Sequence, residues 1–171
     1  RSQPAAGHGL SADQRGMGST DSLGISVNPT QRLAWKQEAL DMAFRAVAAW
    51  PGLRDKLVYK GGRVLAMRLG GTQRASYDLD ANLFQGFASS QPERREQASV
   101  LRRLFQEALQ AHLAVQDPVR YALLDLQVRH RPREAHPLGW NAFEVVIRLA
   151  DAANEGVLGL PVIEFDVSAP E

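Results

Sequence analysis

The chain has 171 residues, of which 44% are hydrophobic and 23% are charged, and this size and composition suit one soluble domain with a buried core. No apolar run approaches the length of a membrane span, so we expect no membrane partner. The formal net charge of +1 excludes a chain-wide attraction to nucleic acid, while the absence of cysteine excludes disulfides and is consistent with a cytoplasmic location.

The first 28 residues differ in composition from the rest. Residues 1–28 are rich in Gly, Ser and Ala and show neither a sustained apolar period nor the apolar core of a signal peptide. We expect them to form a flexible N-terminal arm, followed by a domain over residues 29–171. The chain starts at Arg1 and stops just after a strand-like segment, so truncation of this domain at the C-terminus stays open.

A long helix is predicted directly after the arm. Asn28 is a good capping residue, and Pro29 at the first helical position loses no hydrogen bond. The segment Pro51-Gly52 ends the helical pattern. The apolar positions that recur at helical spacing are Leu33, Leu40, Phe44, Val47 and Trp50.

A glycine corner follows the first predicted strand. The apolar run Lys56–Tyr59 enters Gly61 and Gly62, and good helix formers come after them. Glycines at a strand-to-helix corner let free backbone N–H groups approach a ligand, which suits phosphate. Glycines at such a corner serve turn geometry more often than ligand binding, so phosphate binding needs support from neighbouring residues.

The segment over residues 78–84 places two aspartates on one face of a strand. Asp78 and Asp80 alternate with apolar residues, so the carboxylates share one face and the core lies on the other. Oxygen ligands with Cα atoms about 7 Å apart can hold a divalent metal ion. The alternative is a solvated edge strand with two exposed acids.

The second half of the chain predicts one helix and then strands. The helix covers roughly Pro92–Ala114, and its charged residues form a solvated face. Helices at the front and adjacent strands at the back indicate an α+β domain with a mixed sheet, in which the last two strands pair as antiparallel neighbours. The strands are predicted at Tyr121–His130, Ala142–Ala150 and Pro161–Ser168.

The segment "KGGRVLAMRLGGTQRASYDLD", Lys60 to Asp80, resembles the signature of the nucleotidyltransferase AbiEii/AbiGii toxin family, within the DNA polymerase β-like nucleotidyltransferase superfamily. The family pattern is Gly-Gly-Ser/Thr, a short helix, and Arg-x-Ser-x-Asp-x-Asp. Arg63 stands where the family has Ser or Thr. The matching positions are Gly61, Gly62, Arg74, Ser76, Asp78 and Asp80.

The resemblance implies a nucleotidyltransferase-like mixed sheet flanked by helices and a metal-dependent transfer of a nucleotide from an NTP to an acceptor, such as the 3′ end of tRNA. It implies Mg²⁺ or Mn²⁺ as cofactor and a cognate antitoxin as partner. The residues implied are Gly61, Gly62, Arg63, Arg74 and Ser76 for the nucleotide, and Asp78, Asp80 and Asp166 for metal and catalysis, with Glu164 as the alternative third acid.

The alternative function is a non-catalytic nucleotide- or protein-binding module of the same fold, in which Arg63 marks a decayed site. A third reading is a structural fragment of a larger protein.

Three further groups of residues are notable in the sequence: alternating arginines, the histidines and the tryptophans. Arg129, Arg131 and Arg133 alternate, and they either face a nucleic-acid backbone together or form a solvated strand end. The histidines show no zinc-site spacing. We expect the three tryptophans to pack in the core or at helix ends rather than serve as stacking platforms; they are Trp35, Trp50 and Trp140.

Overall fold

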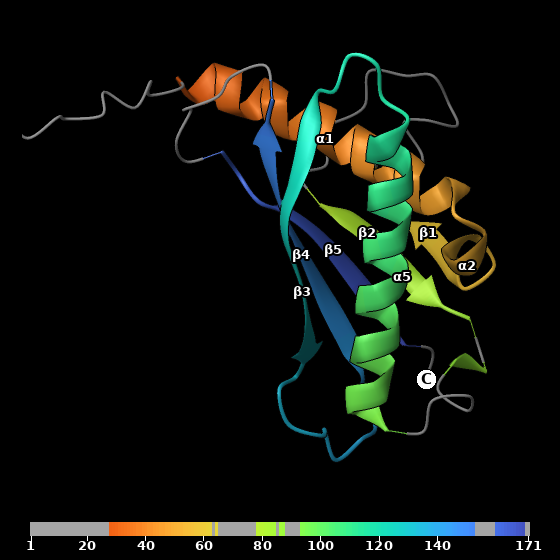
Figure 1. Ribbon diagram of the computed structural model, residues 1–171. Coiled ribbons are helices and arrows are strands. Elements are labelled where there is room, and N and C mark those ends of the chain that lie inside the picture. Colours follow the sequence, from red (N-terminus) through yellow and green to blue (C-terminus); the bar gives the residue numbers. More distant parts are fainter. Residues whose placement is uncertain are drawn as a thin grey trace, which may run out of the picture.

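The computed structural model describes residues 28–62, 64, 78–84, 86–87, 93–152 and 160–169 (Figure 1). Residues 1–27 of the predicted arm therefore lie outside the described part of the chain. The elements, labelled as in Figure 1, are helices α1 (Pro29–Ala49), α2 (Pro51–Arg54) and α5 (Arg94–Ala114), and strands β1 (Leu57–Lys60), β2 (Leu79–Leu83), β3 (Tyr121–Arg131), β4 (Ala142–Asp151) and β5 (Ile163–Ser168).

The five strands form one sheet in the order β1-β2-β5-β4-β3. The pair β2 and β5 is parallel, and the other three neighbouring pairs are antiparallel. Because one pair differs in direction, the sheet is mixed, and the predicted α+β class is confirmed. The predicted antiparallel pairing of the last two strands, β4 and β5, is also confirmed.

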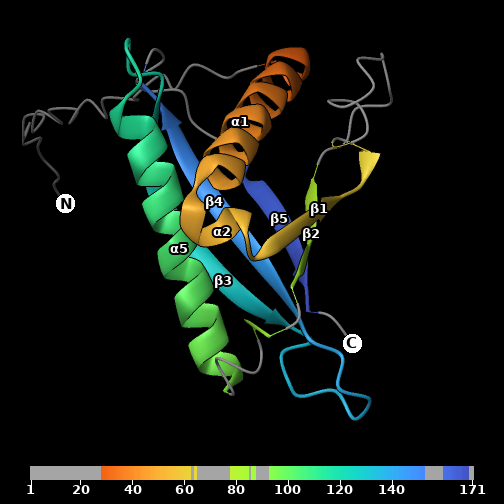
Figure 2. The ribbon, with the colours of Figure 1, turned by 90° about the vertical axis from the view of Figure 1, so that its right-hand side faces the viewer.

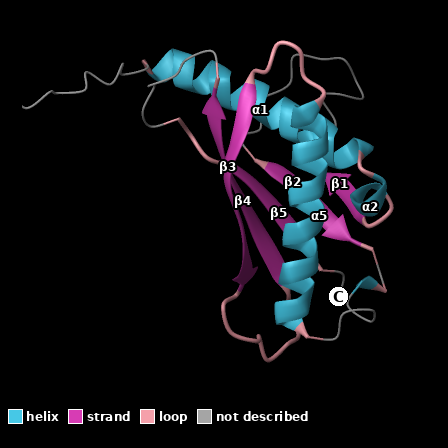
Figure 3. Ribbon diagram, in the orientation of Figure 1, coloured by secondary structure: helices cyan, strands magenta, loops and turns pink. Residues whose placement is uncertain are grey.

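Both long helices cover the same face of the sheet (Figures 1 and 3). The view in Figure 2 places α1 and α5 on one side of the strands. Apolar side chains from both helices and from alternate strand positions form one core, in which Phe105 of α5 packs edge-to-face on Phe165 of β5 at 5.2 Å between ring centroids. The alternation of the strands therefore directs their polar positions to the opposite face.

Helix α1 begins where the sequence predicts. The Asn28 side chain accepts a hydrogen bond from the backbone N–H of Gln31 at 2.9 Å, and the Gln31 side chain accepts one from the backbone N–H of Asn28 at 3.1 Å. This reciprocal capping box satisfies two backbone donors that the helix itself leaves unpaired. The segment Pro51-Gly52 ends α1 but also opens the short helix α2, which the sequence pattern did not predict.

Two side-chain predictions are wrong. The helical spacing places Leu33 in the apolar stripe of α1, but Leu33 is 41% exposed, because it lies in the first turns of the helix, before its buried positions begin at Trp35. Trp140 was expected to pack in the core or at a helix end, yet it is 56% exposed and lies in the connection between β3 and β4, where its ring stacks on His136 at 4.6 Å. The other two tryptophans do pack as expected: Trp35 is buried and Trp50 caps α1.

The described helices include none that combines the length and the apolar character needed to cross a membrane.

The helix predicted after the glycine corner is described only at Gly62 and Val64, which are both in helical conformation.

Candidate functional site

The face of the sheet opposite the helices carries the predicted carboxylates. In β2, Leu79 and Ala81 are buried against the helices, whereas Asp80 between them points to the other face. In β5, Phe165 and Asp166 follow the same alternation, with the aspartate exposed. Both acids are therefore presented on the face that the described helices leave uncovered.

The strand register places five charged residues in one row across this face. Lys60 of β1 lies opposite Asp80, Asp80 lies opposite Asp166, Asp166 lies opposite Glu144 of β4, and Glu144 lies opposite Arg129 of β3. Directly opposed residues share a face, with side chains close enough to interact. We call these five residues the charged row, and its three central members are all acids.

The glycine corner and Asp80 meet in space. Gly61 has a φ of +88°, a left-handed conformation that favours glycine. A Cβ added at this position would lie 2.8 Å from Asp80 Oδ2, so the backbone of Gly61 approaches the carboxylate more closely than any other residue type allows. The sequence placed these two features in one short segment, and the antiparallel pairing of β1 and β2 brings them into contact range.

The acids of the row repel one another. Burial raises the pKa of Asp80, the negative charges of Asp78 and Asp166 raise it further, and Lys60 lowers it. Burial also raises the pKa of Asp166, Arg131 lowers it, and the charges of Glu144 and Asp78 raise it. A cation bound among these groups would relieve this repulsion.

The alternative third acid occupies a different position. Glu164 lies on the same face of β5 as Asp166, but its neighbour across the β4–β5 pair is Val146. Asp166 is the direct neighbour of Asp80 on the parallel pair. The register therefore makes Asp166 the direct neighbour of Asp80, whereas Glu164, one position before Phe165, lies at the level of Asp78, one position before Leu79.

The donor chemistry of the row suits the implied metal, because Mg²⁺ and Mn²⁺ prefer carboxylate oxygens. The charge of Asp78 acts on both Asp80 and Asp166, and the charge of Asp166 acts on Asp80, so the three acids are close neighbours. Within the described ranges, however, no three acidic or imidazole groups already converge as a ligand cluster. The residues fit the ion in chemistry and neighbourhood, and binding would require their side chains to turn toward a common point.

Several predicted nucleotide-binding residues lie outside the described part of the chain. They are Arg63, Arg74 and Ser76. Gly62 is described, and a Cβ added there would meet no atom of the described residues within 4 Å. Of the predicted set, the structure thus brings together Gly61, Asp78, Asp80 and Asp166.

Sequence reasoning missed Lys60 and Glu144 as members of the row. The signal for Glu144 was its position as the single acid in the apolar run "AFEVVI". Its side chain is only 10% exposed and forms ion pairs with Arg131 and, at 3.8 Å, with Arg129. A buried acid in a strand requires such partners, because an unpaired buried charge is costly.

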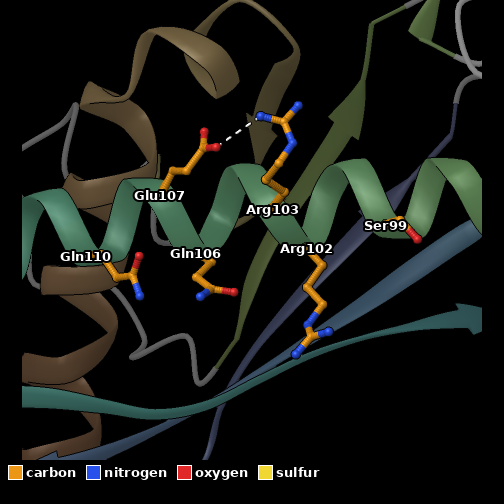
Figure 4. A pocket seen from close by; sticks show the side chains of 6 residues that line it. All are labelled: Ser99, Arg102, Arg103, Gln106, Glu107 and Gln110. Atoms are coloured by element: carbon orange, nitrogen blue, oxygen red, sulfur yellow. Dashed lines mark hydrogen bonds and ion pairs between the residues drawn. The ribbon is translucent and has the colours of Figure 1, made fainter.

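A separate hollow of about 410 Å³ lies along α5 (Figure 4). Arg103 and Glu107 form an ion pair there at 3.0 Å, and Arg102 donates a hydrogen bond from Nε to the carbonyl of Leu126 in β3 at 3.1 Å. Arg102 and Arg103 are exposed, which agrees with the predicted solvated face of this helix. Because α5 covers the other face of the sheet, this hollow is not part of the charged row.

Comparison of the sequence with protein-family models gives no match, and comparison with curated proteins gives none either. The fold and the charged row thus define an α+β protein with a cluster of carboxylates on the sheet face that the described helices do not cover.

Proposed function

We propose that the chain is a metal-dependent nucleotidyltransferase that transfers a nucleotide from an NTP to an acceptor. The observation that carries the proposal is the meeting of three parts: Asp80 and Asp166 as neighbours on the parallel strands, and the Gly61 backbone against the Asp80 carboxylate. Paired carboxylates beside a backbone that can approach phosphate are the parts needed to bind a triphosphate and position it for transfer.

Each residue has a distinct role in the proposal. The backbone at Gly61 and Gly62 would receive the triphosphate, with Arg63, Arg74 and Ser76 near its phosphates. Mg²⁺ or Mn²⁺, held by Asp78, Asp80 and Asp166, would neutralise the negative charge of the triphosphate when bound.

Asp166 is also suited to accept the proton of the acceptor hydroxyl. It lies directly beside Asp80 at the site, and a carboxylate within reach of the acceptor hydroxyl can serve as a general base. The acceptor oxygen would then form a bond to the α-phosphorus, and the bond to the leaving pyrophosphate would break. The tRNA 3′ end as acceptor and the antitoxin as protein partner come from the family resemblance, and both stay predictions.

The test is incubation of the full chain with each labelled NTP, Mg²⁺ and total tRNA, followed by a denaturing gel. Asp80→Ala and Asp166→Asn should abolish labelling of the RNA. Glu164→Gln tests the alternative third acid, since it removes an acid from the same face of β5 and leaves Asp166 in place beside Asp80; retained activity is expected. Urea unfolding of each variant separates loss of chemistry from loss of fold. Full transfer by Asp80→Ala would exclude the proposed mechanism.

A second candidate is a non-catalytic nucleotide-binding module, and the position of Lys60 favours it. Lys60 lies directly opposite Asp80, and its charge lowers the pKa of both Asp80 and Asp166. A cation is thus built into the row itself, and its charge opposes the mutual repulsion of the acids without a metal, although the pKa values of Asp80 and Asp166 remain raised. Calorimetry with NTP in EDTA and in Mg²⁺ distinguishes the two functions: binding of equal strength in both, without transfer to any acceptor, would favour the module.

A further inference from the structure

A pocket of about 300 Å³ lies at the end of β3, at the opposite edge of the sheet from the glycine corner. Two members of the charged row, Arg129 and Glu144, line it. Three of its residues are arginines, and one is an acid. Its lining consists of Arg129, His130, Arg131, Pro132, Arg133 and Glu144. The next acid along the chain, Glu134, is exposed and does not line the pocket, so positive charge exceeds negative charge there.

The single acid of this pocket is shared between two guanidinium groups. The Glu144 side chain is 10% exposed, whereas the side chains of Arg129 and Arg131 are 53% and 62% exposed. The guanidinium of Arg129 also donates a hydrogen bond to Gln127 Oε1 at 2.7 Å. Each guanidinium carries five N–H donors, so the known bonds of these two arginines leave donors that can meet a further acceptor.

The rim of the pocket is held in place from the helix layer. Arg94, the first residue of α5, donates to the carbonyl of Pro132 at 2.7 Å and to Asn141 Oδ1 at 3.2 Å. Asn141 in turn donates to Gln97 Oε1 at 2.9 Å. Both ends of the connection between β3 and β4 are therefore tied to α5, and a pocket organised in advance binds more tightly because less order is lost on binding.

The pocket is adjacent to the acids of the charged row. Glu144 lies opposite Asp166, and the charge of Arg131 acts on Asp166. A group bound at the arginines would thus lie next to Asp166, on the side away from Gly61.

We propose that this pocket binds a phosphate group through Arg129 and Arg131, with Arg133 as a third contact, and that Glu144 occupies the arginines until the phosphate displaces it. The planar fork of arginine matches phosphate oxygens in pairs. Glu144 holds the two side chains in position, and the same carboxylate competes with an incoming anion. The site is separate from the glycine corner and does not require that the chain transfer nucleotides.

Two sources have this chemistry: a free polyphosphate, and the backbone of a nucleic-acid strand. Trp140 distinguishes them. Trp140 is exposed in the connection between β3 and β4, and its indole, which stacks on His136, can also stack on a base.

The test measures binding by the full chain in EDTA and low salt, so that neither metal nor NTP contributes. The probes are inorganic pyrophosphate and a single-stranded ten-nucleotide oligonucleotide. Arg131→Ala should weaken binding at least about tenfold, as expected for loss of a charge-assisted hydrogen bond. Glu144→Gln should tighten binding, because it keeps the shape of the side chain and removes the competing charge.

Arg148→Ala is the matched control. Arg148 is an exposed arginine on the same face of β4, four residues from Glu144, and it does not line the pocket. It should have little effect. An equal loss in the Arg131 and Arg148 variants, weaker binding by Glu144→Gln, or no binding of either probe by the unmodified chain would overturn the proposal.

Urea unfolding checks the fold of each variant. If Arg131→Ala is unfolded, Arg131→Lys replaces it, because lysine keeps the positive charge beside Glu144 but lacks the planar guanidinium fork. The affinity for pyrophosphate should then fall several-fold. Unchanged affinity would refute the site. Binding of pyrophosphate alone assigns the pocket to free polyphosphate. Oligonucleotide binding that weakens in Trp140→Ala assigns it to a strand.

Discussion

Replacing Gly61 by alanine tests the contact between the glycine corner and the carboxylates. The backbone φ of +88° lies in the left-handed region, where a residue with a Cβ costs about 1–2 kcal/mol. The new Cβ would also lie 2.8 Å from Asp80 Oδ2, too close for both atoms to stay in place. Because that oxygen is the free end of a short side chain, it can turn away at little cost, so the carboxylate should move while the fold persists.

Gly61→Ala should therefore reduce the free energy of unfolding by about 1–2 kcal/mol, most of it from backbone strain. Transfer activity should fall much further, by about a hundredfold, because a shift of about 1 Å at a reacting group has effects of that size. Urea unfolding measures the free energy of unfolding, and labelling of tRNA from the NTP that the unmodified chain uses measures the transfer activity.

Gly86→Ala is the control for strain alone. Gly86 has a φ of +96°, and within the described part of the chain a Cβ added there would meet no atom within 4 Å. It should lose a similar amount of stability and keep its activity. Equal transfer by the two variants would refute the argument that Gly61 positions the Asp80 carboxylate.

Three further predictions concern ionisation and stability. Because burial, Asp78 and Asp166 raise the pKa of Asp80, the folded state binds its proton more tightly than the unfolded chain, and stability falls as the pH rises through that pKa. Asp80→Asn should therefore have a higher urea midpoint than the unmodified chain at pH 7, and this difference should vanish below the ordinary pKa of 3.8. Equal midpoints of the variant and the unmodified chain at pH 7 as well as at low pH would contradict the prediction. Asn28→Ala removes the capping oxygen of α1 and should cost about 1 kcal/mol in urea unfolding, whereas an unchanged midpoint would mean that the cap does not stabilise this helix. Phe165→Ala empties a fully buried site beside Phe105 and should cost about 3–5 kcal/mol, and a loss below about 1 kcal/mol would show that the core closes over the cavity.

The local elements of this protein were predictable because their signals lie within a few residues. The capping box at Asn28 and the helical spacing of Leu40 and Val47 mark α1. The alternation around Asp80 marks β2 and the face that its carboxylate takes. Such patterns depend on 3.6-residue and two-residue periods, which are properties of the backbone and need no partner.

The composition of the candidate site was only partly predictable. Asp80 and Gly61 are close in sequence, and their association was expected. Glu144 and Lys60 were not expected, because a lone charge in a short strand is ordinary unless the register of its neighbours is known. Trp140 was misassigned for a related reason: an aromatic residue in a connection carries no periodic signal for burial.

The sequence by itself determined the two long helices, the positions of the strands, and the side of β2 that faces the core. Only the tertiary structure decided that Asp166 lies beside Asp80 and Glu144 beside Asp166. The physical reason is that pairing between distant strands is set by backbone hydrogen bonds and by packing against α1 and α5 together, and a shift of one residue would turn every carboxylate to the other face.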